Sequence, residues 1–253
     1  MTGKLTVAGL GPGQIDWITP AVSKALASAS DIFGYDSYLA RLDAAPHQRL
    51  HASPNRVEIE RANEALALAS SGRAVAMVSG GDPGVFAMAA AIFEAIEHGP
   101  QEWRSIEIVI EPGITAMLAA AARIGAPLGH DFCAISLSDN LKPWDAIEKR
   151  LSLACEADFV IALYNPASKA RPDGIFRAFE ILNSKKNSET IVVFARAIGR
   201  PDESITISTL AGADLSKVDM QTLVLIGSSA TRLVKRGNGI NPWVYTPRSM
   251  APV

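Results

Sequence analysis

The amino-acid sequence predicts an α/β protein in which β-strands alternate with α-helices. Apolar runs of strand length recur along the chain, and each ends abruptly at glycine, proline or polar residues. Segments of helical length follow most of these runs, an alternation that is typical of parallel sheets. The clearest example is residues 74–78, which stop at a Gly-Gly-Asp-Pro turn (residues 80–83) before an alanine-rich helical segment at residues 87–96. The crevice outside such strand ends is where open α/β sheets bind ligands.

The composition is that of an ordinary soluble protein. The chain has 253 residues, enough for one large domain or two medium ones, with 48% hydrophobic and 20% charged residues. The net charge of −2 gives no bulk field that favours nucleic acid or an anionic membrane. No apolar stretch reaches the ~18 residues of a membrane span, and the N-terminus lacks a secretory hydrophobic region. We therefore expect a cytoplasmic protein with no nucleic-acid and no membrane partner.

The cysteines and histidines show no pattern of chemical use. Cys133 and Cys155 lie within apolar runs and form no CxxC pair, which indicates reduced core residues. The four histidines lack metal-ligand spacing, so no metal site is expected.

In the first half, strands are expected at residues 5–10, 31–35, 74–78 and 106–110, and helices at residues 21–30, 56–71, 87–96 and 117–123. Thr19 and Pro20 suit the N-cap and first position of the first helix, and Gly72 suits the end of the second. Residues 46–54 are expected to be irregular. A Gly/Pro-rich stretch at residues 125–129 predicts a boundary between domains 1–128 and 129–253.

In the second half, strands are expected at residues 131–137, 158–163, 190–194, 204–208 and 221–226. Pro143 is expected to open a helix that runs to about Leu153, and another helix ends at about Asn183. The basic cluster 232–236 is predicted to be a solvated helix face. The tail after Gly237 is predicted to be a loosely held extension.

The glycines of residues 9–13 invite comparison with the dinucleotide-binding fingerprint. In that fingerprint the helix opens inside the glycine run, so that its N-terminus holds a pyrophosphate. Here Pro12 removes an N–H group, and the helix is expected only from Thr19 onward. The loop therefore suits a ligand bound across the strand ends better than a phosphate on a helix dipole.

Two residues near helix starts have two interpretations each. The glycines beside Asp82 allow backbone to approach a ligand, and the Asp82 carboxylate would lie at the loop tip. Alternatively, Asp82 is simply a helix N-cap, and this stretch alone favours neither. Thr115 likewise serves either a ligand or the helix backbone.

Five cations follow strand ends in the second half: Lys142, Lys169, Arg171, Arg196 and Arg200. In a mostly parallel sheet these loops lie on one edge. Together they would suit a small molecule with several carboxylates. For any single residue, the alternative is an ordinary solvated loop cation.

Three loops resemble those of the tetrapyrrole methylases, enzymes that use S-adenosylmethionine (SAM): residues 9–13 (Gly-Leu-Gly-Pro-Gly), 80–83 (Gly-Gly-Asp-Pro) and 112–116 (Pro-Gly-Ile-Thr-Ala). Residues 136–139 (Ser-Leu-Ser-Asp) and 163–168 (Leu-Tyr-Asn-Pro-Ala-Ser) resemble the branch of that family that methylates carbon 17 of precorrin-3B in cobalamin synthesis. The resemblance runs in order along nearly the whole chain, to about Ser229.

This resemblance implies two α/β domains with an active-site cleft between them, and a homodimer. It implies that SAM binds in a folded form and leaves as S-adenosylhomocysteine (SAH). Carried over by position, the SAM contacts are Pro12, Gly80, Gly81, Asp82, Val85, Thr115, Ala116, Tyr164 and Ala195.

The implied reaction is methylation of carbon 17 followed by ring contraction to precorrin-4. Contraction benefits from a base near the substrate hydroxyl. Asp139 is the first candidate for that base, and Asn165 is expected to orient the substrate. The remaining substrate contacts implied are Gly11, Ser138, Lys142, Lys169, Arg171 and Arg196.

Three alternatives stay open. In the first, the same fold acts on a cobalt-containing precursor or methylates another ring carbon. A nicotinamide-dependent oxidoreductase would use residues 9–13 with Asp36 as the ribose-binding acid. A non-catalytic protein would bind SAM without transferring the methyl group.

Overall fold

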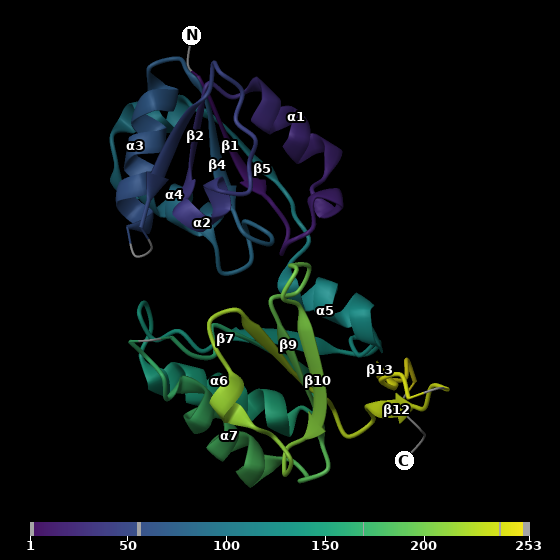
Figure 1. The fold of residues 1–253 in the computed structure, drawn as a ribbon. Coiled ribbons are helices and arrows are strands. Elements are labelled where there is room, and N and C mark those ends of the chain that lie inside the picture. Colours follow the sequence, from purple (N-terminus) through teal and green to yellow (C-terminus); the bar gives the residue numbers. More distant parts are fainter. Residues whose placement is uncertain (1–2, 55–56, 169, 238, 250–253) are drawn as a thin grey trace. The chain divides into compact units, whose positions relative to one another are not determined.

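The computed structural model describes residues 3–54, 57–168, 170–237 and 239–249 (Figure 1). The chain divides into two compact units, Met1–Ala116 and Met117–Val253, and each contains a five-stranded sheet. The domain boundary expected at residue 128 stays a prediction. Just before it, Gly125–Ala126 form β6, which pairs within the second unit.

The first unit contains a sheet in which every pairing is parallel, with strand order β3-β2-β4-β1-β5. Its strands are β1 (Lys4–Gly9), β2 (Asp31–Tyr35), β3 (Arg49–Ser53), β4 (Ala74–Ser79) and β5 (Glu107–Glu111). Its helical elements are η1 (Ile15–Trp17), α1 (Pro20–Ser28), α2 (Asp36–Leu39), α3 (Glu58–Ser70), α4 (Met88–His98) and η2 (Gln101–Ser105). The parallel α/β prediction is confirmed here, whereas the prediction of an irregular stretch at 46–54 is wrong because β3 lies within it.

Helices cover both faces of this sheet, with α1 on one face and α3 and α4 on the other (Figure 1). Strand β4 shows why. Val75 and Met77 pack into the cluster that contains α3 and α4 residues, whereas Ala76 and Val78 pack with Val22 of α1. Side chains of a strand alternate between faces, and burying a valine or methionine contributes about 1.5–3 kcal/mol.

Strands β1 and β4 are neighbours at a topological switch point. The connection from β1 leads to β2 on one side of the pair, and the connection from β4 leads to β5 on the other. In open parallel sheets the crevice at such a reversal is where ligands bind. The loops after β1 and β4 therefore border the crevice in which a ligand is expected to bind.

The second unit contains a mixed sheet with strand order β10-β9-β11-β8-β7. Its strands are β7 (Phe132–Ser136), β8 (Val160–Tyr164), β9 (Ile191–Arg196), β10 (Ser204–Thr209) and β11 (Thr222–Ile226). The helices are α5 (Ala116–Ile124, which begins at the end of the first unit), α6 (Trp144–Glu156), α7 (Gly174–Lys185) and the short η3 (Leu215–Lys217). A cluster of buried residues between this sheet and its helices forms the core.

The expectation of a mostly parallel sheet in the second half is wrong. Within this five-stranded sheet, the β7–β8 pairing is parallel, whereas β10 is antiparallel to β9 and β11 is antiparallel to both β8 and β9. The connection from β9 to β10 is a short hairpin loop, which favours antiparallel pairing because parallel strands need a long crossover. Since β11 opposes both neighbours, β7, β8 and β9 run in the same direction, and their carboxyl ends still share one edge.

The predictions for the C-terminal region are also wrong in part. Residues 232–236 are exposed, as predicted, but residues 232–234 form strand β12 (Arg232–Val234) rather than a helix. Strand β13 (Trp243–Tyr245) pairs with both β12 and β6. The tail residues that the structure describes, 239–249, are anchored to the second unit, because Val244 and Thr246 are only 1% and 2% exposed.

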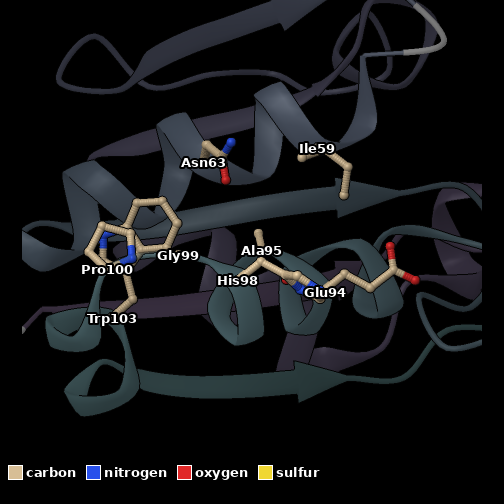
Figure 2. A pocket seen from close by; sticks show the side chains of 8 residues that line it. All are labelled: Ile59, Asn63, Glu94, Ala95, His98, Gly99, Pro100 and Trp103. Atoms are coloured by element: carbon tan, nitrogen blue, oxygen red, sulfur yellow. The ribbon is translucent and has the colours of Figure 1, made fainter.

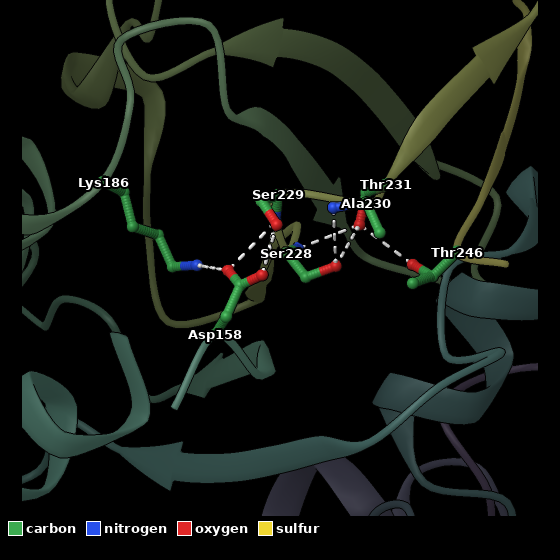
Figure 3. A network of polar contacts seen from close by, with 7 residues as sticks. All are labelled: Asp158, Lys186, Ser228, Ser229, Ala230, Thr231 and Thr246. Carbon is green, nitrogen blue, oxygen red and sulfur yellow. Dashed lines mark hydrogen bonds and ion pairs between the residues drawn. The ribbon is translucent and has the colours of Figure 1, made fainter. Parts of the chain in front are cut away.

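A chain of polar contacts holds this tail within the second unit (Figure 3). Thr246 Oγ1 donates to the carbonyl of Pro127 at 2.6 Å and lies 2.9 Å from Thr231 Oγ1. At the other end, Asp158 accepts hydrogen bonds from the backbone N–H and hydroxyl of Ser229, and Lys186 Nζ lies 3.0 Å from its Oδ1. One set of contacts joins Lys186, Asp158 and Ser229, and the other joins Ser228, Thr231 and Thr246; the peptide bond between Ser228 and Ser229 links the two sets.

Candidate functional site

The loops after β1 and β4 are joined by two backbone hydrogen bonds at the topological switch point. Gly11 N–H donates to the Gly81 carbonyl at 3.1 Å, and Gly81 N–H donates to the Gly11 carbonyl at 3.0 Å. Both residues have left-handed backbone conformations, with φ of 65° and 68°, which glycine adopts without strain. The two loops that resemble the methylase motifs are therefore one structural unit.

The loop after β5 packs against this pair through Gly113. A Cβ atom on Gly113 would collide with the carbonyl oxygen of Gly81 and with the backbone of Gly9, and a Cβ on Gly9 would lie 2.6 Å from Gly113 N. Three strand ends thus meet backbone to backbone, with no room for side chains between them.

The carboxylate of Asp82 bridges two of these loops. Its Oδ1 accepts from Gly84 N–H at 2.8 Å, and its Oδ2 accepts from Gly113 N–H at 3.1 Å. The N-cap interpretation of Asp82 is wrong, because α4 begins only at Met88, where Ala87 stands at the N-cap position. Asp82 instead holds the second loop to the third.

The SAM contacts predicted in the first unit all lie in these three loops. Gly81 faces the third loop, since a Cβ on it would lie 3.7 Å from Thr115 Cα. Thr115 is buried directly before α5. The structure brings together Pro12 after β1, Gly80, Gly81, Asp82 and Val85 after β4, and Thr115 and Ala116 after β5.

Two residues of this region had no signal in the sequence. Arg41, just after α2, donates hydrogen bonds to carbonyls of the first loop. The ring of Tyr38 lies so close to Gly80 that a Cβ there would be 2.7 Å from Tyr38 Cζ. No motif marks either residue, because their roles depend on where α2 packs.

The glycine loop also lacks the geometry of a dinucleotide fingerprint. After Gly13 the chain forms η1, and α1 starts only at Pro20, with Thr19 Oγ1 accepting from Val22 N–H at 3.2 Å. The helix N-terminus therefore does not open inside the glycine run, as binding of a pyrophosphate requires.

In the second unit, the predicted catalytic residues lie after β7 and β8. Asp139 Oδ1 forms an ion pair with Arg171 Nη1 at 3.5 Å. Asn165 Nδ2 donates to Ser136 Oγ at 2.9 Å, and the same hydroxyl accepts from Ser138 N–H at 3.3 Å. The two loops are thus tied together at the shared edge of the sheet.

The predicted cations of this edge differ in whether an acidic side chain forms an ion pair with them. Arg196 forms ion pairs with Asp219 at 2.8 Å and Asp202 at 3.0 Å, and these hydrogen bonds raise its pKa. Lys142 has no ion-pair partner among the residues that the structure describes. Burial, and secondarily the charge of Arg150, lowers the pKa of Lys142. Lys169 lies outside the described residues.

Two polar atoms in the loop after β8 are buried without a hydrogen-bond partner in the described part of the chain: Ser168 Oγ and Arg171 Nε. Such groups are rare in proteins and commonly mark a bound ligand, ion or water. Ser168 is bonded to Arg171 by two backbone hydrogen bonds of 3.0 Å, so both atoms belong to one small turn.

The two SAM contacts predicted in the second unit have different surroundings. Tyr164 ends β8, and its hydroxyl accepts from Met117 N–H in the first turn of α5 at 3.1 Å. Ala195 is buried within β9, next to Arg196.

Among the described residues, three of the four non-glycine residues with left-handed backbone follow strands of these sheets, and the fourth, Asp158, precedes β8. Phe86, Asn165 and Ala197 have φ of 53°, 52° and 49° after β4, β8 and β9 respectively. Left-handed conformations of non-glycine residues cost of order 1–3 kcal/mol and cluster at ligand sites. The left-handed residues Phe86 and Asn165 therefore lie in the same loops as predicted site residues after β4 and β8.

Two surface hollows lie elsewhere. One, of about 390 Å³, is lined by residues of α3, α4 and η2, among them Asn63, His98 and Trp103 (Figure 2). The other, of about 650 Å³, lies beside β13 and includes Tyr245 and Arg248. Neither contains a predicted site residue. Within the described residues, every helix is too short or too polar to cross a bilayer.

Comparison with known proteins identifies close relatives of the chain. The family model of tetrapyrrole (corrin/porphyrin) methylases matches residues 4–214. The chain is 59% identical over 251 residues to a precorrin-3B C(17)-methyltransferase of Sinorhizobium sp., covering 99% of this chain and 98% of the relative. It is 41% identical over 244 residues to a probable cobalt-factor III C(17)-methyltransferase of Salmonella typhimurium, covering 96% and 99%. The crystal structure of the methyltransferase CobJ matches with a TM-score of 0.91 and 53% identity, covering 97% of this chain and all of that one.

Proposed function

The chain belongs to the tetrapyrrole methylase family, and from this premise we propose that it methylates carbon 17 of precorrin-3B, with SAM as methyl donor, and contracts the macrocycle to precorrin-4 in cobalamin synthesis. The observation that carries the proposal is the 59% identity to a precorrin-3B C(17)-methyltransferase across 99% of the chain. The oxidoreductase alternative has no support, because the family match and the late start of α1 both oppose it.

The three glycine loops of the first unit suit SAM. The donor is a sulfonium nucleotide without phosphates, so it needs close backbone approach rather than a helix N-terminus. Gly11, Gly81 and Gly113 contact one another through their backbones, so no side chain of these residues covers the switch point. Ligands of open α/β sheets bind at such switch points. When bound, SAM supplies the electrophilic methyl group. The loops contribute chiefly by fixing its position and approach angle.

The edge loops of the second unit suit a substrate with peripheral carboxylates. Lys142 offers a half-buried ammonium group without an ion-pair partner in the described residues, and Arg171 offers a guanidinium whose Nε is unpartnered there. Planar guanidinium groups bind carboxylates with two parallel hydrogen bonds. Arg196 is less available, because Asp202 and Asp219 already neutralise it.

Asp139 is proposed as the base of ring contraction. In methyl transfer, carbon 17 forms its bond to the methyl carbon as sulfur takes back the bonding pair and leaves as SAH. In contraction, the meso-carbon hydroxyl loses its proton to the Asp139 carboxylate, and the freed O–H pair forms the carbonyl of the acetyl group. One of the two ring bonds of that carbon breaks, its electron pair forms the bond that joins the two flanking ring carbons, and the conjugated macrocycle takes up the displaced pair. A substrate carboxylate bound to Arg171 competes with Asp139 for the guanidinium and so frees the base.

The metal state of the substrate is the open alternative within the family. The Salmonella relative is named for cobalt-factor III, and its lower identity of 41% favours the metal-free substrate. Folded SAM, a homodimer, a cleft between two domains and a cytoplasmic location remain proposals from the resemblance.

The test is to incubate the purified protein with SAM and either metal-free precorrin-3B or cobalt-factor III, and to weigh the products by mass spectrometry. Gain of one methyl group on precorrin-3B, with faster turnover than on the cobalt compound, supports the proposal. Methylation of the cobalt compound alone assigns the enzyme to the other branch. No methyl transfer to either substrate, despite SAM binding, contradicts a methyltransferase function.

A further inference from the structure

Arg41 binds the first glycine loop through three backbone carbonyls. Its Nη2 donates to the carbonyls of Leu10 at 2.8 Å and Gly13 at 3.3 Å, and its Nη1 donates to the carbonyl of Gly11 at 3.1 Å. A single guanidinium thus spans the stretch that contains Pro12. The fork of fixed N–H directions makes this possible, whereas a lysine ammonium is a compact point charge.

The same contact reaches the second glycine loop. The Gly11 carbonyl that accepts from Arg41 also accepts from Gly81 N–H at 3.0 Å. Tyr38 precedes Arg41 by one helical turn, and its carbonyl accepts from Arg41 N–H at 3.1 Å. Since the Tyr38 ring lies directly against Gly80, the short segment after β2 supports both loops at the switch point.

We propose that Arg41 is a positioning residue that holds the loop of Gly11 and Pro12 in the shape that binds SAM. The inference rests on the proposed function, which makes this loop part of the SAM site. Residues 10–14, between β1 and η1, belong to no helix or strand, and the backbone hydrogen bonds described for Leu10 and Gly11 go to β4 and the loop that follows it. The guanidinium supplies the missing constraint, and a site held in advance binds its ligand without the entropic cost of ordering the loop.

The proposal is tested by substituting Arg41 and measuring SAH binding by calorimetry. Arg41→Ala should weaken SAH binding by about ten-fold or more, and raise KM for SAM much more than it lowers kcat. The KM for the tetrapyrrole should not change. Guanidinium ion at tens of millimolar should restore part of the lost affinity. Arg41→Lys should not restore it, because one ammonium group does not bind all three carbonyls.

A matched control is Arg104→Ala. Arg104 also donates to a backbone carbonyl, that of Glu97 at 3.2 Å, but it lies on η2, away from the glycine loops. This variant should bind SAH as the unaltered protein does. If Arg41→Ala does not fold, Arg41→Lys alone decides: weaker SAH binding by folded protein supports the proposal.

SAH affinity that is unchanged in the folded Arg41→Ala or Arg41→Lys protein would overturn the proposal. Loss of affinity that merely parallels a fall in the thermal midpoint, without rescue by guanidinium, would also overturn it, because the role would then be general stability. Failure of the unaltered protein to bind SAH would overturn the proposed function itself, and the two failures are therefore distinguishable.

Discussion

Arg171 Nη1 lies 3.5 Å from Asp139 Oδ1, so the proposed base is paired with a proposed carboxylate-binding residue. The Asp139 side chain is 39% exposed and that of Arg171 is 18% exposed. The pair therefore lies at the surface of its loops, where an incoming carboxylate is able to compete for the arginine. Under the proposed function, binding of a substrate carboxylate to Arg171 would release Asp139 as the base.

Asp139→Asn should abolish proton removal while keeping the shape of the side chain. Turnover of precorrin-3B to precorrin-4 should fall by about 100-fold or more, the usual contribution of a general base. SAM affinity, measured by calorimetry, should stay nearly unchanged because the glycine loops are untouched. Asp145→Asn, an exposed carboxylate in the first turn of α6, is the control. Normal turnover by Asp139→Asn would remove this residue from the mechanism.

Gly81→Ala should strain the bridge to Gly11. There is space for a methyl group at this position, but φ of 68° is unfavourable for alanine by about 1–2 kcal/mol. Gly113→Ala should be worse, because its Cβ collides with backbone. SAH affinity and the denaturant midpoint should both fall in the order Gly237→Ala, Gly81→Ala, Gly113→Ala. Gly237 has open space around it and serves as the control. Equal behaviour of all three variants would contradict the described loop packing.

Acid should destabilise the first unit through Asp31. Burial alone raises the pKa of this carboxyl group, but hydrogen bonds from His51, Ser30 and Arg73 outweigh it and lower the pKa below its ordinary 3.8. A lowered folded-state pKa contributes stability that is present above the unfolded value and is lost as pH falls through the folded one. The unfolding free energy in urea should therefore decrease from about pH 5 downward.

Asp31→Asn should flatten that pH dependence. It should also lower the free energy of unfolding at neutral pH by about 3 kcal/mol, the lower end of the range for breaking a buried ion pair. The lower end applies because Asp31 is 1% exposed but its partner Arg73 is 35% exposed. An unchanged slope between pH 5 and 3 in this variant would show that other carboxylates dominate acid unfolding.

Asp158→Ala should destabilise the second unit. It removes the acceptor for Ser229 and leaves the Lys186 side chain, 4% exposed, with an unpaired charge. We expect the free energy of unfolding in urea to fall by about 2 kcal/mol. This is less than for a fully buried pair, because Asp158 is 44% exposed. Glu156→Ala breaks the neighbouring exposed pair with Lys185 and should change stability little. If both variants lost the same free energy of unfolding, the network in Figure 3 would not stabilise the tail as described.

Local signals in the sequence were sufficient for much of the fold. The strand at residues 31–35 and the Thr19 cap of α1 are confirmed, because apolar runs and capping residues act within a few positions of the chain. Gly72 ends α3 with φ of 93°, as a C-cap glycine does.

The remaining features depend on tertiary contacts that no local pattern encodes. Strand β3 is short and partly exposed at the sheet edge, and β13 is stabilised by pairing with the distant β6. The direction of β11 follows from its neighbours. The sequence alone does not distinguish Arg41 from the rest of the 24 lysines and arginines. Its contact with the Gly11 carbonyl depends on where α2 packs. The SAM contacts and Asp139 are predicted from motif resemblance, and the cations also from their positions after strand ends; the roles of all these residues stay predictions.

The most direct measurement is a crystal structure of the protein with SAH bound. The account predicts that SAH lies over the loops after β1, β4 and β5, and that it contacts Gly81 and Thr115. SAH bound elsewhere, clear of both residues, would contradict the account.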